Sequence, residues 1–397
     1  METGARTDPA ALVDEGQLVE LTKGILRIPS PLGEERPLGE FVAAELERFG
    51  FAVELQEVTN GRANVIGIAR GDPAYKSIML NGHLDMNRPF GKWRRSPYDP
   101  WVEGGRLYGG MVTDMKGGLG SMIAAAAAVL QAAARPRGDL IVTAVMHHDT
   151  TGVGTKYFLE SCPWRIDAAI VAEPTDLNLQ TYHCGAWGFL ITTRGIQKHL
   201  TRLEEGYVNA IDGMMRIVQR LGPQILTYER DPEHPFLPRM VWGYINGGAP
   251  ERHKLTAETC TLQGDVRFLP SMSFDGIRRD FERLLAEVCA EMPGLSAKVQ
   301  AATQQWPYRI GHDAEIVRTI TDVQTRLLGR APRLLEGMPL AAGVTDAADI
   351  MRHGIPAAIY GPGEFLQVAD ESVAVADLVA GARVMAAVCA DITGRRR

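Results

Sequence analysis

Cysteine is scarce in this chain, and its placement excludes two kinds of site. The 397 residues contain five cysteines, an odd number with no Cys-x-x-Cys pair among them. Such a set predicts neither a disulfide framework nor a thiolate zinc site. A reducing environment fits this usage, so we expect a cytoplasmic protein. The five are scattered along the chain at Cys162, Cys184, Cys260, Cys289 and Cys389.

Long apolar segments and an excess of positive charge are also missing. The longest apolar run, Met122 to Leu130, is too short to cross a bilayer, and its alanine content favours a buried helix. The N-terminus lacks a charged region followed by an apolar one, so we expect no signal peptide and no membrane partner. The net charge of -6 leaves no basic footprint for nucleic acid. We therefore expect a small-molecule substrate.

What the chain does contain is typical of soluble globular proteins. Hydrophobic residues make up 45% and charged residues 23% of the sequence, which excludes disordered and fibrous classes. At about 150 residues per domain, the length predicts two to three domains.

The order of the expected elements changes twice along the chain. Helical spacing and short apolar strands alternate up to Glu173, which predicts a mostly parallel sheet covered by helices. Strands and two long helices follow, in the order of an α+β sandwich, and α/β alternation then returns. We predict a catalytic domain in two parts, at 1–184 and 303–397, with an inserted domain at 185–302. The clearest expected strands are 185–194, 240–246 and 259–268, and the clearest helices are 17–26, 34–49, 116–134, 209–221, 274–291, 314–328 and 373–392.

Three strings carry side chains suited to chemistry. His83-Leu84-Asp85 follows an apolar strand, and a histidine there can bind metal while a carboxylate fixes its tautomer. About thirty residues later, Asp114 stands before a glycine pair and a helix, where it is either a ligand or a helix N-cap. Glu173 ends a third apolar strand and is followed by a proline.

In order and spacing these strings are similar to those of one family. Further matches are Gly195 to His199, Asn209-Ala210-Ile211, Asp265 to Pro270, Thr345-Asp346-Ala347 and Gly361-Pro362-Gly363. The chain thus resembles the metallohydrolases that include acetylornithine deacetylase, succinyl-diaminopimelate desuccinylase, carboxypeptidase G and aminoacylase. The resemblance implies an α/β, zinc-exopeptidase-like catalytic domain and an inserted lid or dimerisation domain. It also implies a homodimer or higher homo-oligomer.

The resemblance further implies the ligands of one metal. His83, Asp114 and Glu173 would form that site, with Asp114 shared between two metals and Asp85 orienting His83. This nitrogen and oxygen set suits zinc, manganese, cobalt or iron.

The chain departs from the family where the second metal and the base are expected. Two consecutive glutamates are usual after the strand that ends near Met146, but this chain has His148 and Asp149. A neutral imidazole can take a proton from water, so His148 is a candidate base and Asp149 a candidate ligand. The alternative for His148, and more so for His147, is a core histidine with a satisfied hydrogen bond.

A second departure lies near the C-terminus, where the family places a metal-binding histidine. Counting back from Asp370-Glu371 places Gln367 there, whereas counting forward suggests a two-residue deletion. Either way a strong ligand is missing, because an amide is a poor substitute for imidazole on a transition metal. We therefore expect one divalent transition metal per chain, Mn, Zn or Co, with Gln367 as a substrate-binding residue.

Residues of the inserted domain complete the predicted site. By resemblance, His199 reaches the active site of the opposing subunit and stabilises developing negative charge. Asn209 and Arg267 are candidates for holding a substrate carboxylate. For Arg267 the alternative is a structural ion pair.

These residues leave three hypotheses for function. The first is a metal-dependent hydrolase of a C–N bond in a small carboxylate-bearing substrate. Within it, hydrolytic deamination of an aromatic amine such as 5-nitroanthranilate, with release of ammonia, would explain the altered base. The alternatives are a conventional deacylase or peptidase acting on N-acyl amino acids or dipeptides, and an inactive relative that only binds a ligand.

Overall fold

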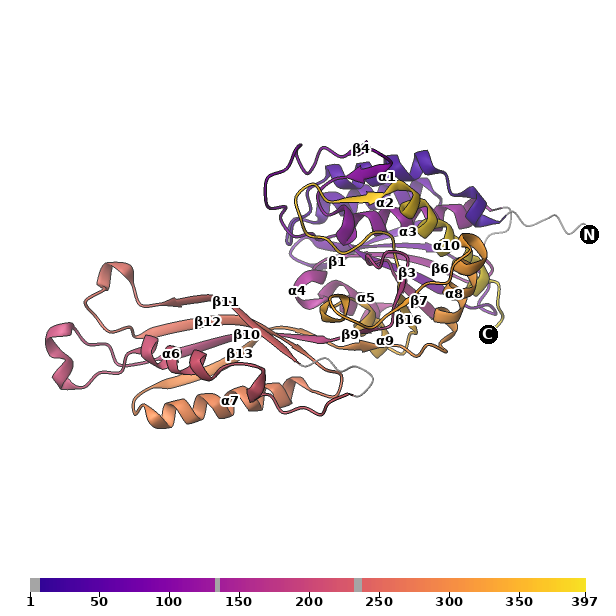
Figure 1. Cartoon of the computed structure of the whole chain (residues 1–397). Helices are drawn as coiled ribbons and strands as arrows, with labels where there is room; N and C mark the ends of the chain where they lie inside the picture. The colour runs from indigo at the N-terminus through magenta and orange to yellow at the C-terminus, as the bar shows by residue number, and fades with distance from the viewer. Residues whose placement is uncertain (1–7, 133–135, 232–237) are drawn as a thin grey trace, which may run out of the picture. The chain divides into compact units, whose positions relative to one another are not determined.

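The computed structural model describes residues 8–132, 136–231 and 238–397, which form two compact units (Figure 1). Unit 1 contains the residues up to Tyr182 together with Arg309–Leu340 and Thr345–Arg397. Unit 2 contains His183–Tyr308 and the short return segment Ala341–Val344. Each unit has a sheet and a core of its own.

Unit 1 is built on an eight-stranded sheet with the order β1-β2-β6-β3-β7-β16-β8-β15. At its centre β6, β3, β7 and β16 are parallel neighbours, whereas β1 and β2 are added antiparallel at one side. The mostly parallel sheet that the sequence predicts is therefore confirmed. Its strands are β1 (Ala52–Thr59), β2 (Arg62–Ala69), β3 (Ile78–His83), β6 (Leu140–Val145), β7 (Ala168–Val171), β8 (Leu179–Gln180), β15 (Leu334–Leu335) and β16 (Ala357–Ile359).

Helices cover both faces of this sheet. Figure 1 shows α3 and α10 on one side of it and α5 and α9 on the other. Helix α3 is buried along almost its whole length, as its run of alanines predicts, because it packs between α1, α10 and the sheet. The helices are α1 (Glu15–Arg27), α2 (Arg36–Arg48), α3 (Gly117–Gln131), α4 (His148–Thr151), α5 (Val153–Ser161), α8 (Glu315–Leu328), α9 (Ala347–Arg352) and α10 (Val375–Thr393). The end expected for α3, at Ala134, lies outside the described residues.

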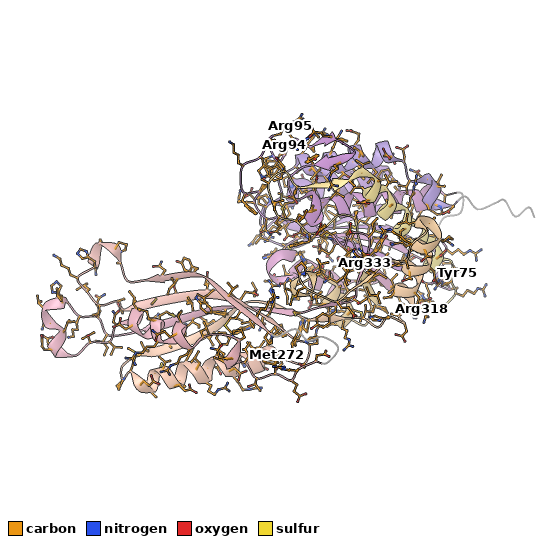
Figure 2. All side chains as sticks on the ribbon, in the orientation of Figure 1. Tyr75, Arg94, Arg95, Met272, Arg318 and Arg333 are labelled. Carbon is orange, nitrogen blue, oxygen red and sulfur yellow. The ribbon has the colours of Figure 1, made fainter. Side chains whose placement is uncertain are left out.

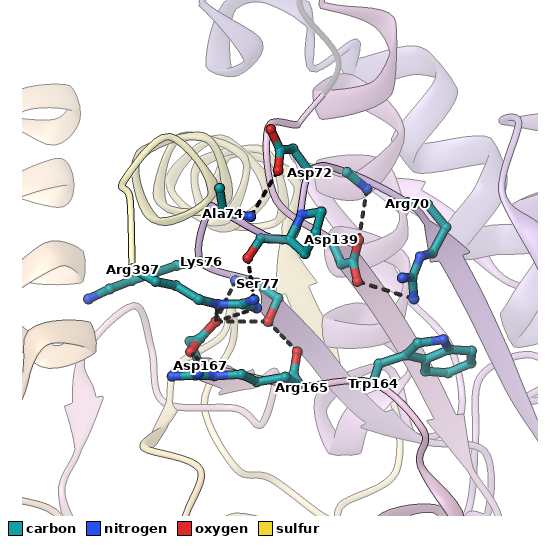
Figure 3. Close-up of polar contacts among 12 residues, drawn as sticks. Arg70, Asp72, Ala74, Lys76, Ser77, Asp139, Trp164, Arg165, Asp167 and Arg397 are labelled. Atoms are coloured by element: carbon teal, nitrogen blue, oxygen red, sulfur yellow. Dashed lines mark hydrogen bonds and ion pairs between the residues drawn. The ribbon is translucent and has the colours of Figure 1, made fainter.

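The amino edge of the parallel strands is held by a polar network (Figure 3). Asp167, just before β7, accepts hydrogen bonds from the backbone N–H of Ser77 at 2.9 Å and from Nε of Arg397 at 3.0 Å. Burial favours the neutral carboxyl, but these donors outweigh it and lower the pKa of Asp167. The network ties the start of β3 and the C-terminal residue to one edge of the sheet and leaves the opposite edge for chemistry.

Unit 2 is a four-stranded antiparallel sheet with two helices packed on it, which confirms the expected α+β domain. The strand order is β11-β12-β10-β13, and one core joins the sheet to both helices through Trp187, Phe189 and Phe281. Phe281 contacts both other rings at 4.9 Å between centroids. The elements are β10 (Gly185–Arg194), α6 (Ala210–Arg220), β11 (Arg239–Gly247), β12 (Thr259–Phe268), α7 (Phe274–Glu291) and β13 (Ser296–Gln305).

Short elements complete the chain. The small strands are β4 (Trp101–Glu103), β5 (Arg106–Tyr108), β9 (Tyr182–His183), β14 (Tyr308–Arg309) and β17 (Ser372–Ala374). Within the described ranges, no helix combines the length and the apolar character needed to cross a membrane.

Candidate metal centre

Three neighbouring strands deliver side chains to one point at the carboxyl edge of the unit 1 sheet. His83 is the last residue of β3, His148 follows β6, and Glu173 follows β7. Because β6, β3 and β7 are parallel neighbours, these ends lie side by side. All three residues are buried, with 5 to 7% exposure.

The fourth side chain, Asp114, comes from the turn before α3. Its backbone is extended (φ -133°, ψ 92°), and α3 starts later, with Lys116 at the N-cap position and no side-chain cap. The reading of Asp114 as a helix N-cap is therefore wrong. The glycine pair has a packing role, since a Cβ on Gly118 would lie 2.0 Å from the carbonyl oxygen of Ala172. Only glycine lets α3 approach the end of β7, next to Glu173.

The donor atoms converge at distances suited to one metal ion. Nε2 of His83 lies 3.5 Å from Oδ1 of Asp114 and 3.8 Å from Oε1 of Glu173. Nε2 of His148 lies 3.9 Å from the same oxygen of Glu173. Ligand atoms bound at about 2.0–2.1 Å to a tetrahedral zinc are about 3.4 Å apart, so modest contraction would complete a coordination shell.

Two of these atoms make no hydrogen bond within the described part of the chain, and a bound cation would satisfy both of them. Nε2 of His83 and Oε1 of Glu173 are buried and make no hydrogen bond with the described residues. A buried polar atom left unpaired carries a large desolvation cost. Among the described residues, the ligand atoms of His83, His148 and Glu173 lie within 4.8 Å of one another. The donor set therefore fits a transition metal.

Each imidazole is oriented by an oxygen on its other nitrogen. Nδ1 of His83 lies 2.8 Å from the backbone carbonyl oxygen of Asp85, and Nδ1 of His148 lies 3.1 Å from Oδ1 of Asp346. The carbonyl oxygen of Asp85 can only accept from Nδ1 of His83, and a carboxylate oxygen of Asp346 lies beside Nδ1 of His148, so Nε2 of each ring is the nitrogen that faces the other donors. The carboxylate of Asp85 accepts a hydrogen bond from the backbone N–H of His148 at 2.9 Å. Asp85 thus links the two histidines.

The two histidine rings are stacked, with centroids 4.4 Å apart and an angle of 6° between their planes. The preceding residue, His147, has a left-handed backbone (φ 57°) and makes a different contact. Nδ1 of His147 lies 3.0 Å from Nη1 of Arg62, which also pairs with buried Glu35. His147 therefore belongs to a structural ion-pair cluster, in keeping with the core alternative.

The pKa values of the donor residues show that the site favours positive charge. Burial and the neighbouring His148 disfavour the imidazolium of His83, but Asp114, Glu173 and Asp85 outweigh them and raise its pKa to about 9. Burial likewise opposes protonation of His148, and Asp346 outweighs it and raises the pKa of that ring. Burial raises the pKa of Glu173 to about 7. The clustered carboxylates attract protons when no metal cation is bound, and a metal would displace them.

Gln367, which stands where a second metal ligand was expected, contacts Asp114. Nε2 of Gln367 donates a hydrogen bond to Oδ2 of Asp114 at 3.1 Å. Oδ2 is the oxygen of Asp114 other than Oδ1, the one that lies 3.5 Å from Nε2 of His83. The side chain of Asp149, the other expected ligand, lies outside the described part of the chain.

Three predicted site residues belong to unit 2, where Arg267 donates to the carbonyl oxygen of Ala342 and Asn209 accepts from the backbone N–H of Ala257, both at 3.1 Å. His199 caps a short helical turn by accepting from the backbone N–H of Thr201, and Asn209 caps α6. Nε of Arg267 pairs with Asp265 at 2.7 Å, the structural ion pair that was its alternative. Their roles toward a substrate stay predictions.

Asp346 is the functional residue that sequence reasoning missed. This residue is 2% exposed and stands at the N-cap position of α9, beside His148. The sequence did contain a signal for Asp346, because Thr345-Asp346-Ala347 is one of the strings that carry the family resemblance. That resemblance assigned no role to the carboxylate of Asp346.

A comparison with protein families shows to which family this chain belongs. Residues 79–391 match the model described as "Peptidase family M20/M25/M40". The chain belongs to this family. Acetylornithine deacetylase of Erwinia tasmaniensis is 28% identical over 326 residues, covering 80% of each chain. The N-formyl-4-amino-5-aminomethyl-2-methylpyrimidine deformylase of Halalkalibacterium halodurans is 24% identical over 397 residues, covering 91% of each.

Among solved structures, the M20 fold recurs at lower identity. The YXEP protein of Bacillus subtilis, described as a dinuclear metal-binding peptidase of family M20, superposes with a TM-score of 0.68 at 14% identity. The match covers 96% of this chain and 98% of that one. As an M20 member, this chain is a metal-dependent hydrolase that acts on C–N bonds, and the family includes dinuclear enzymes.

Proposed function

We propose that this M20 enzyme hydrolyses the amide bond of small N-acyl amino acids or dipeptides at a centre holding one divalent transition metal. The observation that carries the proposal is the position of His148. Its Nε2 faces the same point as His83 and Glu173, at 3.9 Å from Oε1 of Glu173. We assign His148 as a metal ligand, in place of the base role that the resemblance implies.

The contact of Gln367 supports a single metal. Its amide N–H donates a hydrogen bond to Oδ2 of Asp114. The other oxygen, Oδ1, lies beside Nε2 of His83, and we assign it to the single metal. An amide N–H carries partial positive charge and so takes the place of a second cation beside this carboxylate. The ligand set would be two imidazoles and two carboxylates, from His83, His148, Asp114 and Glu173.

Each part of the site has a defined task in this proposal. A bound metal of this class polarises a carbonyl and lowers the pKa of water. The backbone carbonyl of Asp85 and the carboxylate of Asp346 hold the two imidazoles with Nε2 toward the centre. His83, His148 and Glu173 are buried and Asp114 is partly buried, so the attraction between these donors and a cation is screened less than it would be in water.

The similarity to deacylases favours an amide substrate over an aromatic amine. Acetylornithine deacetylase and the formylpyrimidine deformylase both have names that describe removal of an acyl group. Nothing in these comparisons supports deamination of a nitroanthranilate. A cytoplasmic location, a homodimer and the substrate contacts of His199, Asn209 and Arg267 stay predictions.

The proposal is tested with the full chain loaded with Mn, Zn or Co. N-acetyl and N-formyl amino acids and dipeptides are supplied, and release of the free amine is followed. We expect hydrolysis that a chelator removes and that Asp114→Ala abolishes. Ammonia release from 5-nitroanthranilate with no amide hydrolysis would overturn the proposal in favour of deamination.

A further inference from the structure

Two contacts lie side by side between the turn that carries Asp114 and the segment 366–371. Nε2 of Gln367 donates a hydrogen bond to Oδ2 of Asp114 at 3.1 Å. The preceding residue of each partner also takes part, because the hydroxyl of Thr113 lies 2.5 Å from the carbonyl oxygen of Leu366. The contact of Thr113 with Leu366 therefore fixes the backbone from which the amide of Gln367 reaches Asp114.

Glu371 holds the same turn from the other end of the segment. One carboxyl oxygen accepts a hydrogen bond from the backbone N–H of Met111 at 2.5 Å, and the other contacts the hydroxyl of Thr113. Thr113 is 1% and Glu371 3% exposed, so water competes little for these bonds. Met111 has a left-handed backbone (φ 61°), which few residues other than glycine adopt. Such a conformation persists where its surroundings hold it, and the bond to Glu371 does so here.

The residue before Glu371 attaches the segment to a further part of unit 1. The carboxylate of Asp370 accepts hydrogen bonds from the backbone N–H and from Nε of Arg94, at 3.0 and 3.1 Å. Arg94 also pairs with Glu103 at 3.0 Å and is followed by Arg95 on the surface of unit 1 (Figure 2). The segment is therefore attached on both sides of Gln367.

The hydroxyl of Thr113 indicates which form of Glu371 this arrangement uses. A hydroxyl carries one proton, and the carbonyl of Leu366 can only accept it. Both contacts of Thr113 are hydrogen bonds at once only if the carboxyl of Glu371 supplies a second proton. Burial raises the pKa of Glu371 to about 7, although the hydrogen bonds from Thr113 and Met111 lower it, so the protonated carboxyl is populated near neutral pH. A glutamine offers the same oxygen acceptor and a comparable donor.

We propose that Thr113 and Glu371 are positioning residues of the metal centre, which hold the amide of Gln367 against Oδ2 of Asp114. This inference rests on the proposed function, in which Asp114 is a ligand of a single metal. Removing a partner that orients a metal ligand lowers metal affinity about 10- to 100-fold. Because Thr113 and Glu371 act through Gln367, the loss of either should have the same effect as the loss of that amide.

The test is a double-mutant cycle on the affinity of the full chain for Co, measured by competition with a chelator. Gln367→Ala and Thr113→Val should each lower the affinity about 10-fold or more, and should change the visible Co spectrum in the same way. The double variant should bind Co no more than about 3-fold more weakly than either single variant, because both changes remove one contact. The cycle is repeated with Glu371→Ala in place of Thr113→Val, so that it does not depend on one variant folding.

Two further variants separate positioning from a general loss of stability. Glu371→Gln should keep the Co affinity within about 3-fold of the wild type, since its side chain reproduces the protonated carboxyl. Thr193→Val removes another buried hydroxyl, which donates to the carbonyl oxygen of Ala210 at 2.9 Å within unit 2. It should lower the stability to urea and leave the Co affinity and spectrum unchanged.

The outcomes distinguish this inference from the function on which it rests. Losses of affinity that multiply in the double variants overturn the positioning role, even if amides are hydrolysed, and so does a Glu371→Gln variant that binds Co as weakly as Glu371→Ala. Losses that do not multiply, in a chain that hydrolyses no amide, remove the proposed function and leave the positioning role standing. A wild-type chain that binds no metal overturns both.

Discussion

Replacing Asp346 by asparagine tests whether His148 is a metal ligand. The carboxylate of Asp346 lies 3.1 Å from Nδ1 of His148 and is 2% exposed, so the substitution removes one buried charge and little volume. An asparagine can still accept through its amide oxygen, but it no longer increases the basicity of the ring. If Nε2 of His148 binds the metal, metal affinity must fall.

The expected loss of metal affinity is taken from other metal sites in which a carboxylate orients a ligating histidine. Removing a carboxylate that orients a ligating histidine lowers metal affinity about 10- to 100-fold, or about 1.4 to 2.8 kcal/mol. Affinity is measured by competition with a chelator at fixed pH, using Co or Zn. The visible spectrum of the Co-loaded chain is an independent readout, because it reports the ligands.

The same helix offers a matched control. Asp349 is also buried, three residues from Asp346, but its carboxylate lies 3.8 Å from Nζ of Lys156. We expect Asp349→Asn to change metal affinity less than about 3-fold and to leave the Co spectrum unchanged, since it removes no partner of a metal ligand. The ligand role of His148 is refuted if Asp346→Asn lowers only the rate of hydrolysis and binds Co as the wild type does.

Three further predictions concern metal number, stability and pH. In the presence of excess metal, Gln367→His should bind more than one metal per chain, by elemental analysis, whereas Gln367→Ala should stay at one; equal content in the two variants would show that the amide does not limit the site. Gly118→Ala should lower the free energy of unfolding by about 1–3 kcal/mol or more, because its Cβ meets the carbonyl of Ala172, and urea unfolding checks this. Burial raises the pKa of Asp349 to about 6, so the folded state loses stability as pH rises through this value, because the unfolded carboxyl ionises near its usual pKa. Asp349→Asn should therefore be more stable than the wild type by up to about 3 kcal/mol at pH 8, with the gain vanishing near pH 4; a gain independent of pH would contradict this.

The long elements were predictable because their patterns are strong. The strands β10 and β12 and the helix α7 match the expected bounds, since each joins an alternating or helical pattern to a clear turn or cap, such as Ser273 before α7. The strand β13 was not predicted. Its sequence, SAKVQAATQQ, has few large apolar residues because most of it is exposed at the edge of its sheet.

The donor residues could be found from sequence, whereas their mutual contacts could not. His83, Asp114 and Glu173 follow from strand ends and motifs, but the pairing of His148 with Asp346 joins residues 198 positions apart in the chain. The orientation of His83 by the backbone of Asp85, rather than by its carboxylate, depends on a local turn that residue types do not specify. The amide of Gln367 on Asp114 is likewise a tertiary contact.

The central claim is one metal held by four side chains that include His148. Elemental analysis of the dialysed wild type and of His148→Ala, after loading with excess Mn, Zn or Co, tests it most directly. We predict one metal per chain in the wild type and much less than one in His148→Ala. Two metals per chain in both proteins would contradict the claim.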